Sequence, residues 1–449
     1  MAKKIYGLII ILSLILTTFS FVKPAKAVSY TDLASHWAPK IYQDVNTTYG
    51  VRADFVTNFN YDGDWIGNNN WNNLYNYPEN GYVYYKVQET DTHYFIEYDF
   101  FHARDDGPTS PDAHENDLEG MLLALKKDGS TYGSFHLMET MAHNQWYQYT
   151  NDPSITTGSD NVDGGVLFEG SHPKVFIQSN GQSPWGGHGV FAYDGTGAPG
   201  GDGIVYDYTG IAEFPTDAAG DYTHAYGFAL QSIDEFWNRR YDVGGAGHTY
   251  ETFGVFDGDD YTTDSAKAPW MWDDSDDGPT FEGMNFSDPA HQIDTHLNGL
   301  GGFSHNYLYN PYYSHKITLN TITSNANRDP FGGKSDIYVK IYVNGQGFSD
   351  DRLWKFNDST LGAARSVIWG HDSAAFGNNF SSNYSTIYVT KAHNVEVNLN
   401  VLDSDGTSGD DDMGSLSAYP VPGQTVTYSN TYTSSGQALV SATVSANIE

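Results

Sequence analysis

The chain of 449 residues contains no cysteine, so neither a disulfide framework nor a thiolate metal site can hold it together. Basic residues are also few, because 22 lysines and arginines stand against 56 aspartates and glutamates, with a formal net charge of −34. Nucleic acid and anionic lipid repel a chain so acidic, and we therefore expect no nucleic-acid partner. A halophile-like solvated surface explains the same charge without any site, whereas bound divalent cations would reverse the repulsion locally.

Hydrophobic runs long enough to span a bilayer are lacking after the amino terminus. At the amino terminus, Lys3 and Lys4 precede an apolar run, and Ala25 and Ala27 fit a small-residue cleavage site. We expect residues 1–27 to be a signal peptide that is cleaved near Ala27, which makes the protein secreted and extracellular. An uncleaved anchor is the alternative.

The chain is rich in aromatic residues and glycine, with 15% aromatics, 34 tyrosines and 47 glycines. This mixture favours short strands and long loops over helices, and the length allows two domains with separate cores. We predict an all-β protein, with a β-sandwich domain over residues 28–313 and a second β-sandwich over residues 314–449. Strands are expected at 82–87, 93–101 and 172–178, a hairpin at 117–141, and a short helix at 233–241.

Five aspartates flank two strand-like runs in the carboxy-terminal part. Asp329 and Asp336 precede the alternating run 336–343, and Asp403, Asp405 and Asp411 follow the run 395–402. Clustered carboxylates repel one another unless a cation lies between them, and oxygen ligands in flexible loops suit Ca²⁺. The pattern predicts a calcium-loop module. Solvated acidic turns, or a lone EF-hand-like fragment without its closing glutamate, are the alternatives.

The spacing of these aspartates resembles that of a C2 domain. The third calcium loop of the family has an Asp-x-Asp pair, a third Asp eight positions after the first, and a later Gly. These positions correspond to Asp403, Asp405, Asp411 and Gly414 in this chain. Residues 328–340 resemble the family's first calcium loop. The resemblance implies a C2-like β-sandwich that binds Ca²⁺. In many C2 domains bound Ca²⁺ bridges to lipid head groups, and others are protein-interaction modules.

The chemistry of the amino-terminal domain centres on residues 114–119. Residues two apart on a strand share a face, so Asp117 and Glu119 should point the same way, with His114 approaching from the preceding loop. Asp105 and Asp106 end the preceding strand and could face the same spot. One imidazole with three carboxylates favours Mg²⁺, Ca²⁺ or Mn²⁺ over zinc. A loop histidine beside a solvated glutamate is the alternative.

This segment resembles the necrosis- and ethylene-inducing-peptide-like (Nep-like) proteins and vacuolar-protein-sorting relatives. The Nep-like signature is Gly-His-Arg-His-Asp-Trp-Glu. Its first His, its Asp and its Glu correspond to His114, Asp117 and Glu119 in this chain. The metal-binding Asp that lies upstream in the family corresponds to Asp106. The resemblance implies a divalent metal, Mg²⁺ or Ca²⁺, at one end of a β-sandwich. Some members of the family bind sphingolipid head groups and lyse plant membranes.

The signature is not complete in this chain. Glu115, Asn116 and Leu118 replace its Arg, second His and Trp, and the cysteines of toxin members are absent. The metal site therefore carries over better than the cytolytic activity does.

Two further features are candidate binding elements. Trp270 and Trp272, next to the acidic run 273–277, could stack against a sugar, and the glycine-flanked His188 could line a pocket. Nucleophile elbows, phosphate loops and zinc-protease helices are not recognisable in the sequence.

Three functions fit these patterns. The first is a secreted, divalent-metal-dependent binding or effector protein that recognises lipid head groups or glycans at a membrane or cell surface, docked by the Ca²⁺ module. The second is a metal-dependent hydrolase of phospholipid or glycan, with His114 or Glu119 as general acid–base. The third is a structural surface protein braced by ions. We favour the first, because oxygen-rich ion sites recur in both parts and no activated nucleophile is visible.

Overall fold

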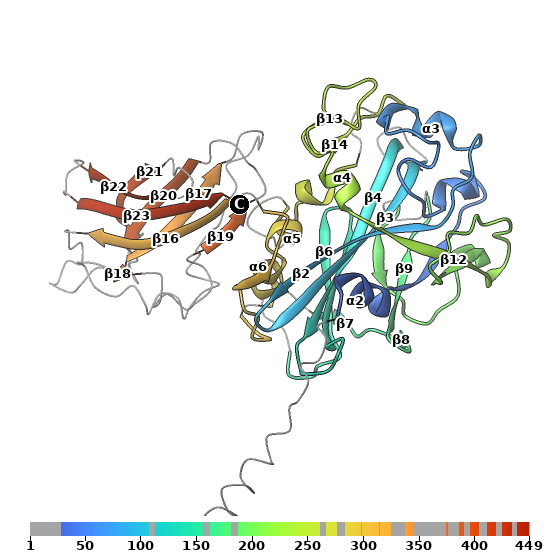
Figure 1. Cartoon of the computed structure of the whole chain (residues 1–449), viewed down its shortest axis with the longest axis horizontal. Helices are drawn as coiled ribbons and strands as arrows, with labels where there is room; N and C mark the ends of the chain where they lie inside the picture. Colours follow the sequence, from blue (N-terminus) through green and yellow to red (C-terminus); the bar gives the residue numbers. More distant parts are fainter. Residues whose placement is uncertain are drawn as a thin grey trace, which may run out of the picture.

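The computed structural model describes residues 28–313, except 107–112, 156–161, 181–186, 261–265, 276–282 and 298. Beyond residue 313 it describes the backbone of eight strands between His315 and Ile448. Strands dominate and the helices are few and short, which confirms the predicted all-β class (Figure 1). Among the described residues, no helix has the length and apolar character needed to cross a membrane.

The strands of the amino-terminal part are β1 (Lys40–Asp44), β2 (Tyr82–Thr90), β3 (His93–Asp105), β4 (His114–Lys126), β5 (Ser134–Ala142), β6 (Gln145–Tyr149), β7 (Val162–Gly164), β8 (Phe168–Glu169), β9 (His172–Ile177), β10 (Val190–Ala192), β11 (Gly203–Tyr208), β12 (Asp221–Ser232), β13 (Tyr250–Thr252), β14 (Val255–Phe256) and β15 (Tyr307–Tyr309). The α-helices are α2 (Tyr30–Trp37), α3 (Asn70–Asn73), α4 (Asp234–Trp237), α5 (Met284–Ser287) and α6 (Pro289–His296). Single 3₁₀ turns are η1 (Val51–Asp54), η2 (Gly67–Asn69), η3 (Pro199–Gly201) and η4 (Pro269–Met271).

One large sheet organises this part of the chain. Within the described residues it has 13 strands, in the order β10-β9-β1-β11-β12-β2-β3-β4-β5-β6-β7, with β15 beside β2 and β8 beside β9. Strands β2 to β6 are antiparallel, whereas β1 with β9, β11 with β12, and β12 with β2 are parallel pairs. The sheet curls, because β10 at one end packs back against β4 and β5. Curling brings the two ends of the sheet around one interior.

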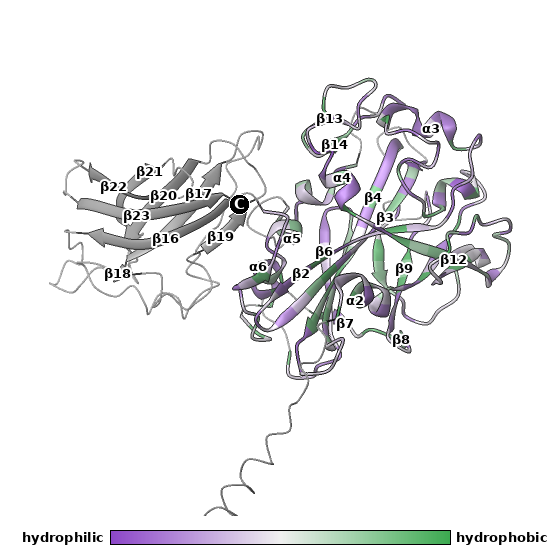
Figure 2. Cartoon of the chain, in the orientation of Figure 1, coloured by the Kyte–Doolittle hydropathy of each residue, from purple (hydrophilic) through white to green (hydrophobic). Residues whose placement is uncertain are grey.

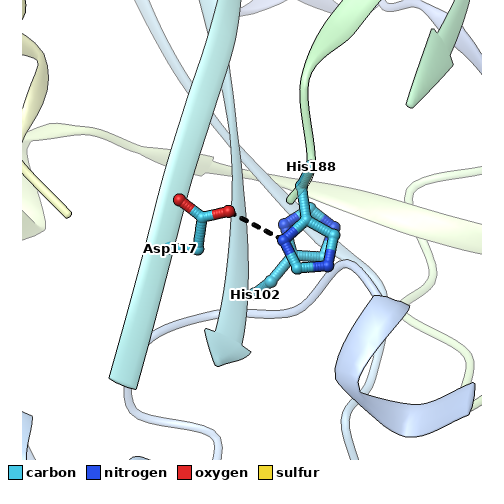
Figure 3. A group of neighbouring side chains, drawn as sticks. All are labelled: His102, Asp117 and His188. Carbon is cyan, nitrogen blue, oxygen red and sulfur yellow. Dashed lines mark hydrogen bonds and ion pairs between the residues drawn. The ribbon is translucent and has the colours of Figure 1, made fainter. Parts of the chain in front are cut away.

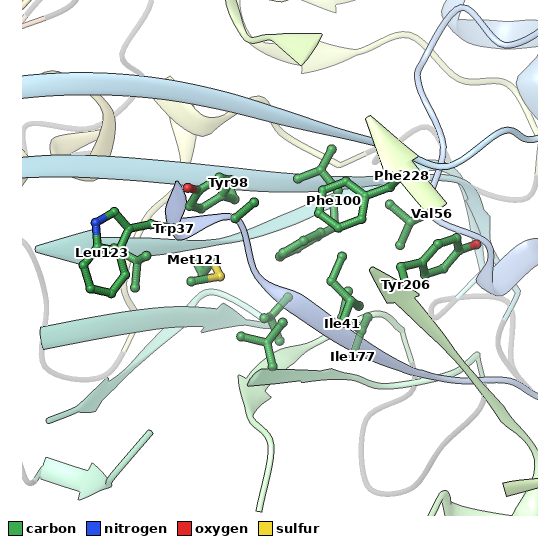
Figure 4. Packing of buried hydrophobic residues seen from close by; sticks show 14 of the residues in the cluster. Trp37, Ile41, Val56, Tyr98, Phe100, Met121, Leu123, Ile177, Tyr206 and Phe228 are labelled. Atoms are coloured by element: carbon green, nitrogen blue, oxygen red, sulfur yellow. The ribbon is translucent and has the colours of Figure 1, made fainter. Parts of the chain in front are cut away.

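A first hydrophobic core fills the inside of the curl. Figure 4 shows its members converging from α2, β1, β3, β4 and β9, among them Trp37, Ile41, Tyr98, Met121 and Ile177. Helix α2 closes this core with Leu33, Ala34 and Trp37, and its first turn is capped by the Ser29 hydroxyl, which accepts the Asp32 N–H at 3.0 Å. The short helix is therefore stabilised by the core it covers rather than by its length.

A second core lies on the other face of β2 to β5. It joins Phe95 and Leu122 of the sheet to Trp270, Phe286 and Ile293 of η4, α5 and α6. Figure 2 shows hydrophilic residues on outer elements such as α3, and also along parts of the central strands β2 and β4. Because β3 and β4 are covered on both faces, every charged side chain along their middle is desolvated.

The predicted strands at 82–87, 93–101 and 172–178 correspond to β2, β3 and β9, and the predicted hairpin is the β4–β5 pair. The helix expected at 233–241 is helical only at Asp234–Trp237. Helices α2 and α6 were not predicted. Both are only two turns long, and α6 is buried along nearly its whole length, which removes the amphipathic pattern that identifies a surface helix.

The carboxy-terminal strands are β16 (His315–Ser324), β17 (Ile337–Asn344), β18 (Ala374–Ala375), β19 (Thr386–Val389), β20 (Glu396–Asp403), β21 (Asp411–Ala418), β22 (Gln424–Tyr432) and β23 (Ala438–Ile448). In their described backbone they form a five-stranded sheet around β16 and β23 and a three-stranded sheet in the order β17-β20-β21. The runs predicted as strands at 336–343 and 395–402 are β17 and β20.

Of the five aspartates expected to bind Ca²⁺, Asp329, Asp336 and Asp405 lie outside the described residues. Asp403 ends β20, Asp411 begins β21, and the two are register partners. Ile337, the first residue of β17, is the partner of Asp403 on its other side. The backbone thus brings two predicted ligand positions to one end of the three-stranded sheet. The domain limits and the signal peptide, whose residues are outside the described range, stay predictions.

Candidate metal centre

The site forms where β3 ends and β4 begins. The antiparallel register places Asp105 opposite His114, and His102 opposite Asp117. Between these pairs Asn116 adopts a left-handed backbone with φ of 60°, a conformation that asparagine tolerates better than most residues. The Asn116 amide donates to the backbone carbonyls of Gly67 and Asp257, both at 2.8 Å.

The residues that depart from the Nep-like signature are therefore structural anchors. Besides Asn116, Glu115 accepts the backbone N–H of Trp71 at 2.7 Å and that of Asp259 at 3.2 Å. These bonds tie the start of β4 to loops far away in the sequence, and they hold the strand end in place beside the pocket.

A pocket of about 290 Å³ opens at this strand end. It brings together four acidic and imidazole groups that the sequence singled out, namely Asp105, His114, Asp117 and Glu119. The other residues that line it are Leu118, Met141, His143, Asn144, Gly187, Ala266, Lys267 and Trp272. Asp117 and Glu119 face the same space, as their spacing on the strand predicts.

Two of the carboxylates are in an unfavourable environment without a cation. Asp105 Oδ1 and Glu119 Oε2 are buried and have no hydrogen-bond partner among the described residues. Burial, and next the negative charge of Asp117, raise the pKa of Asp105 to about 7. The same two causes raise the pKa of Glu119 well above its usual value. Both groups would be stabilised in their charged form by a cation in the pocket.

Asp117 is ionised because a histidine cation holds it. His188 Nδ1 lies 2.7 Å from Asp117 Oδ2 (Figure 3). On its other side, His188 Nε2 lies 3.4 Å from Asp54 Oδ1. Although burial opposes the charge, hydrogen bonds to the two aspartates raise the pKa of His188 to about 10. Burial would raise the pKa of Asp117, but the bond to His188 outweighs it and lowers that pKa below its usual value.

His102 stacks on His188 with ring centroids 3.6 Å apart and an interplanar angle of 5°. Burial and the neighbouring His188 charge lower the pKa of His102 well below its usual value, so it is neutral. Donor atoms of His102, Asp117 and His188 all lie within 4.8 Å of one another. The three donor atoms are close enough to share an ion, and the contact with His188 orients Asp117.

His114 presents an available nitrogen to the pocket. Its Nδ1 lies 2.9 Å from the backbone carbonyl of Asn116, which can only accept, so Nδ1 carries the proton. The free Nε2 is 3.8 Å from Asp105 Oδ2. Carboxylate oxygens with one imidazole nitrogen form a donor set that fits a divalent cation loosely.

No family model and no curated protein matches this chain. Solved structures that match part of this chain include a necrosis- and ethylene-inducing protein from the causal agent of cocoa's witches' broom disease (13% identity, TM-score 0.23, covering 47% of this chain and 78% of that one). Another is NLPPya in complex with glucosamine (14% identity, TM-score 0.23, 47% and 76%). A third is the C2A domain of a plant extended synaptotagmin 1 (9% identity, TM-score 0.20, 31% and 98%). TM-scores this low establish neither a shared fold nor a shared function.

Asp106, the position that the resemblance assigned to the metal, does not line the pocket. Its carboxylate pairs with Arg104 at 3.1 Å, and its backbone N–H donates to Asn180 Oδ1 at 2.6 Å. The structure therefore favours its neighbour Asp105 as the aspartate at the end of β3.

The tryptophans expected to stack against a sugar are both buried. Trp270 is 0% exposed and packs among Trp237, Tyr250 and Phe286, so it is a core residue. Trp272 is 2% exposed but borders the pocket, and its Nε1 donates to the Lys267 carbonyl at 2.8 Å. Neither ring offers a free face to a ligand. Asp274, in the acidic run that follows these tryptophans, is also buried.

The sequence did not reveal most of the groups that complete the site. His188 was considered only as a pocket residue, and His102, Asp54 and His143 were not considered. One signal was available in the glycine before His188. A Cβ at Gly187, whose φ is 91°, would lie 2.8 Å from Asp105 Oδ2, so a glycine is needed where the two segments approach.

Proposed function

We propose that this pocket binds a divalent cation, Ca²⁺ or Mg²⁺, and through it the oxygens of a lipid head group or glycan. The chain would then act as a secreted binding or effector protein at a membrane or cell surface. The observation that carries the proposal is the pair of buried carboxylate oxygens, Asp105 Oδ1 and Glu119 Oε2, that have no partner among the described residues.

The charges around the pocket favour a divalent cation. Three carboxylates meet here. The basic side chains near them are His188, already shared between Asp117 and Asp54, half-buried Lys267, and the imidazoles of His114 and His143 that line the pocket. Leaving buried carboxylates without a counter-charge is costly, and a bound cation removes that cost.

The size and exposure of the pocket support a ligand beyond the ion. Its volume of about 290 Å³ lies at the lower end of the range of about 300–1,000 Å³ that is typical of ligand pockets. The side chain of His114 is 19% exposed and Asn144 is exposed, so the ion would be reachable from solvent. Because Ca²⁺ takes six to eight oxygen ligands, ligand hydroxyl or phosphate oxygens can complete its shell.

The carboxy-terminal aspartates support a second cation-dependent contact. The backbone partners Asp403 and Asp411 lie at one end of their sheet, at the strand ends where the predicted loops begin. Ca²⁺ held there would allow this acidic chain to approach an anionic surface that otherwise repels it.

Calorimetric titration of the chelator-treated full chain with Ca²⁺ and Mg²⁺ tests the cation site. Wild type should bind, and thermal unfolding should show stabilisation of about 2.7 kcal/mol at a cation concentration one hundred times Kd. Asp105→Asn with Glu119→Gln should abolish amino-terminal binding. Asp128→Asn, a carboxylate exposed in the turn after β4, is the matched control and should change nothing.

Vesicle flotation and glycan binding, each with and without EDTA, test the ligand. Binding that requires the cation and is lost in the Asp105→Asn, Glu119→Gln variant supports the proposal. Cation binding without any surface or glycan binding would instead favour the ion-braced structural protein. No cation binding at all would refute the proposal.

A hydrolase is the second candidate, and the His114 geometry favours it. Because Nδ1 donates to the Asn116 carbonyl, His114 directs its Nε2 toward the cation pocket, the orientation that a general base requires. Glu119, whose pKa is raised, could serve as the acid. Turnover of phospholipid or glycan that disappears in His114→Ala would establish this activity, and an inactive wild-type protein would exclude it for the substrates tried.

A further inference from the structure

A lysine, a glutamate and an asparagine meet in the second core, away from the pocket. Lys86 comes from β2, Glu97 from β3 and Asn285 from α5. The side chains of Lys86 and Glu97 are both 0% exposed, and Asn285 is 1% exposed. Lysine and glutamate are rarely buried so completely, and the function proposed above does not use them.

One carboxylate holds both the amine and the carboxamide. Lys86 Nζ lies 3.0 Å from Glu97 Oε2, and Asn285 Nδ2 donates to Glu97 Oε1 and Oε2, each at 3.3 Å. Lys86 Nζ also donates to the backbone carbonyl of Asn285 at 3.2 Å and to Gln88 Oε1 at 2.6 Å. The amine is therefore fixed beside the asparagine across a separation of 199 residues in the chain.

Complete burial favours uncharged forms of the lysine and the acid. The rings of Phe286 and Tyr312, with centroids 4.9 and 5.8 Å from Lys86 Nζ, act in the opposite direction, because aromatic faces attract an ammonium. Burial lowers the pKa of Lys86 although Glu97 opposes this, and burial raises the pKa of Glu97. The proton can therefore move from the ammonium to the carboxylate, which leaves a free amine next to a carboxylic acid.

We propose that Lys86 and Asn285 become joined by an intramolecular isopeptide bond, with Glu97 as the proton-transfer group. Lys86 Nζ attacks Asn285 Cγ, so that a new C–N bond forms and the Cγ–Nδ2 bond breaks. Glu97 receives a proton from the attacking nitrogen and delivers one to the departing nitrogen, which leaves as ammonia. The step is an exchange of one amide for another, and it needs no oxidant, reductant or cofactor.

Asp99 is the group that keeps this cluster neutral. It lies two residues after Glu97 on β3 and is 0% exposed, and both of its carboxyl oxygens are buried without a hydrogen-bond partner in the described structure. Burial, and next the charge of Glu97, raise the pKa of Asp99 well above its usual value, so Asp99 holds a proton while Lys86 and Glu97 exchange theirs. A cross-link at this position would also tie β2 to α5 in a chain that has no cysteine for a disulfide.

The test is the mass of the full chain, purified without added cation and measured under denaturing conditions. If the bond forms, the measured mass should be lower, by the mass of one ammonia, than the mass calculated from the sequence of the chain after removal of the signal peptide. Digestion should yield a branched peptide that contains both Lys86 and Asn285, with no tryptic cleavage after Lys86. Finding the two residues in separate peptides of unmodified mass would overturn the proposal.

Three variants sharpen the result. Glu97→Gln and Lys86→Met should both have the full mass calculated from their sequences. Lys127→Met should still be lighter than its calculated mass by one ammonia. Lys127 is the matched control because it pairs with Glu89 at 2.6 Å but is partly exposed, and no asparagine side chain is hydrogen-bonded to this pair in the described structure. An asparagine succinimide also loses ammonia, but it leaves Lys86 in its own peptide and would contradict the bond.

Should Glu97→Gln or Lys86→Met fail to fold, the wild-type peptide map still decides the question. The inference does not depend on the cation pocket, so either can fail while the other stands.

Discussion

Two clusters of buried acids lie on the same pair of strands and are neutralised in different ways. Around Glu97 and Asp99 the chain supplies its own amine, because Lys86 lies 3.0 Å from Glu97 and Asn285 occupies both oxygens. Around Asp105 and Glu119 two buried oxygens have no hydrogen-bond partner in the described structure, and both oxygens of Asp99 in the first cluster share this state. The pocket also reaches solvent. A buried acid that has its own lysine has no need of an ion, whereas buried acids beside an opening provide a place for one.

Removing the lysine from the internal cluster should have the largest effect on stability. Lys86→Met breaks the buried Lys86–Glu97 pair and removes the proposed link to Asn285, which is expected to destabilise the fold by about 3–5 kcal/mol. Lys127→Met, at the partly exposed pair with Glu89, should cost less than about 1 kcal/mol. Denaturant unfolding of both variants measures the difference. Equal costs would mean that the internal cluster is no more dependent on its lysine than a surface pair is.

The acidic pocket should instead respond to pH and to added cation. Since burial raises the pKa of Asp105 to about 7, the folded state binds a proton that the unfolded state has lost. Without divalent cations the contribution of Asp105 to stability is therefore greatest below pH 4 and falls as pH rises to about 7. The loss is at most about 4 kcal/mol. Saturating Ca²⁺ should flatten this fall, and Asp105→Asn should reduce it by the part that Asp105 contributes, while Glu119, whose pKa is also raised, keeps the rest.

Thermal unfolding between pH 5 and pH 8, with EDTA or Ca²⁺, provides the measurement. The control Asp128→Asn should keep both the fall and its reversal by Ca²⁺. An unchanged fall in the Asp105→Asn variant would show that another group in the pocket titrates there.

The contrast between the two clusters also explains what the sequence could predict. Alternating aromatic and β-branched residues predicted β2, β3 and β9, and the spacing of Asp117 and Glu119 predicted their shared pocket, because both depend on local geometry. The same alternation implies that Glu97 and Asp99 face solvent. They do not, because η4, α5 and α6 cover that face, and a strand pattern carries no information about elements nearly 200 residues away.

The position of the metal-site aspartate was also beyond local rules. Asp105 and Asp106 are adjacent, and only the register with His114 and the Arg104 pair distinguishes them. His188 joins the site from a distant segment whose neighbouring glycine, Gly187, makes room for the Asp105 carboxylate. Such contacts arise from tertiary packing, and neither composition nor spacing encodes them.

Removing the histidine that holds Asp117 should weaken the cation site without eliminating it. His188→Gln leaves the carboxylates in place but releases Asp117 from its 2.7 Å contact, and a loss of about 10–100-fold in cation affinity is expected. His248→Gln is the matched control, because His248 makes a contact of the same length with Asp242 at an exposed position. Calorimetric titration compares the two. Equal affinities in both variants would show that the histidine does not orient the site.

The smallest effect should follow from Asp106→Asn, and it distinguishes the two assignments of the strand-end aspartate. Asp106 contacts Arg104 rather than the pocket, so the substitution removes a half-buried ion pair and costs less than about 1 kcal/mol. Cation affinity should equal that of wild type, whereas Asp105→Asn should lower it strongly. If Asp106→Asn instead abolished cation binding and Asp105→Asn did not, the cation would be bound by Asp106, the position implied by the Nep-like resemblance. The two unpartnered oxygens would then have to be satisfied in some other way.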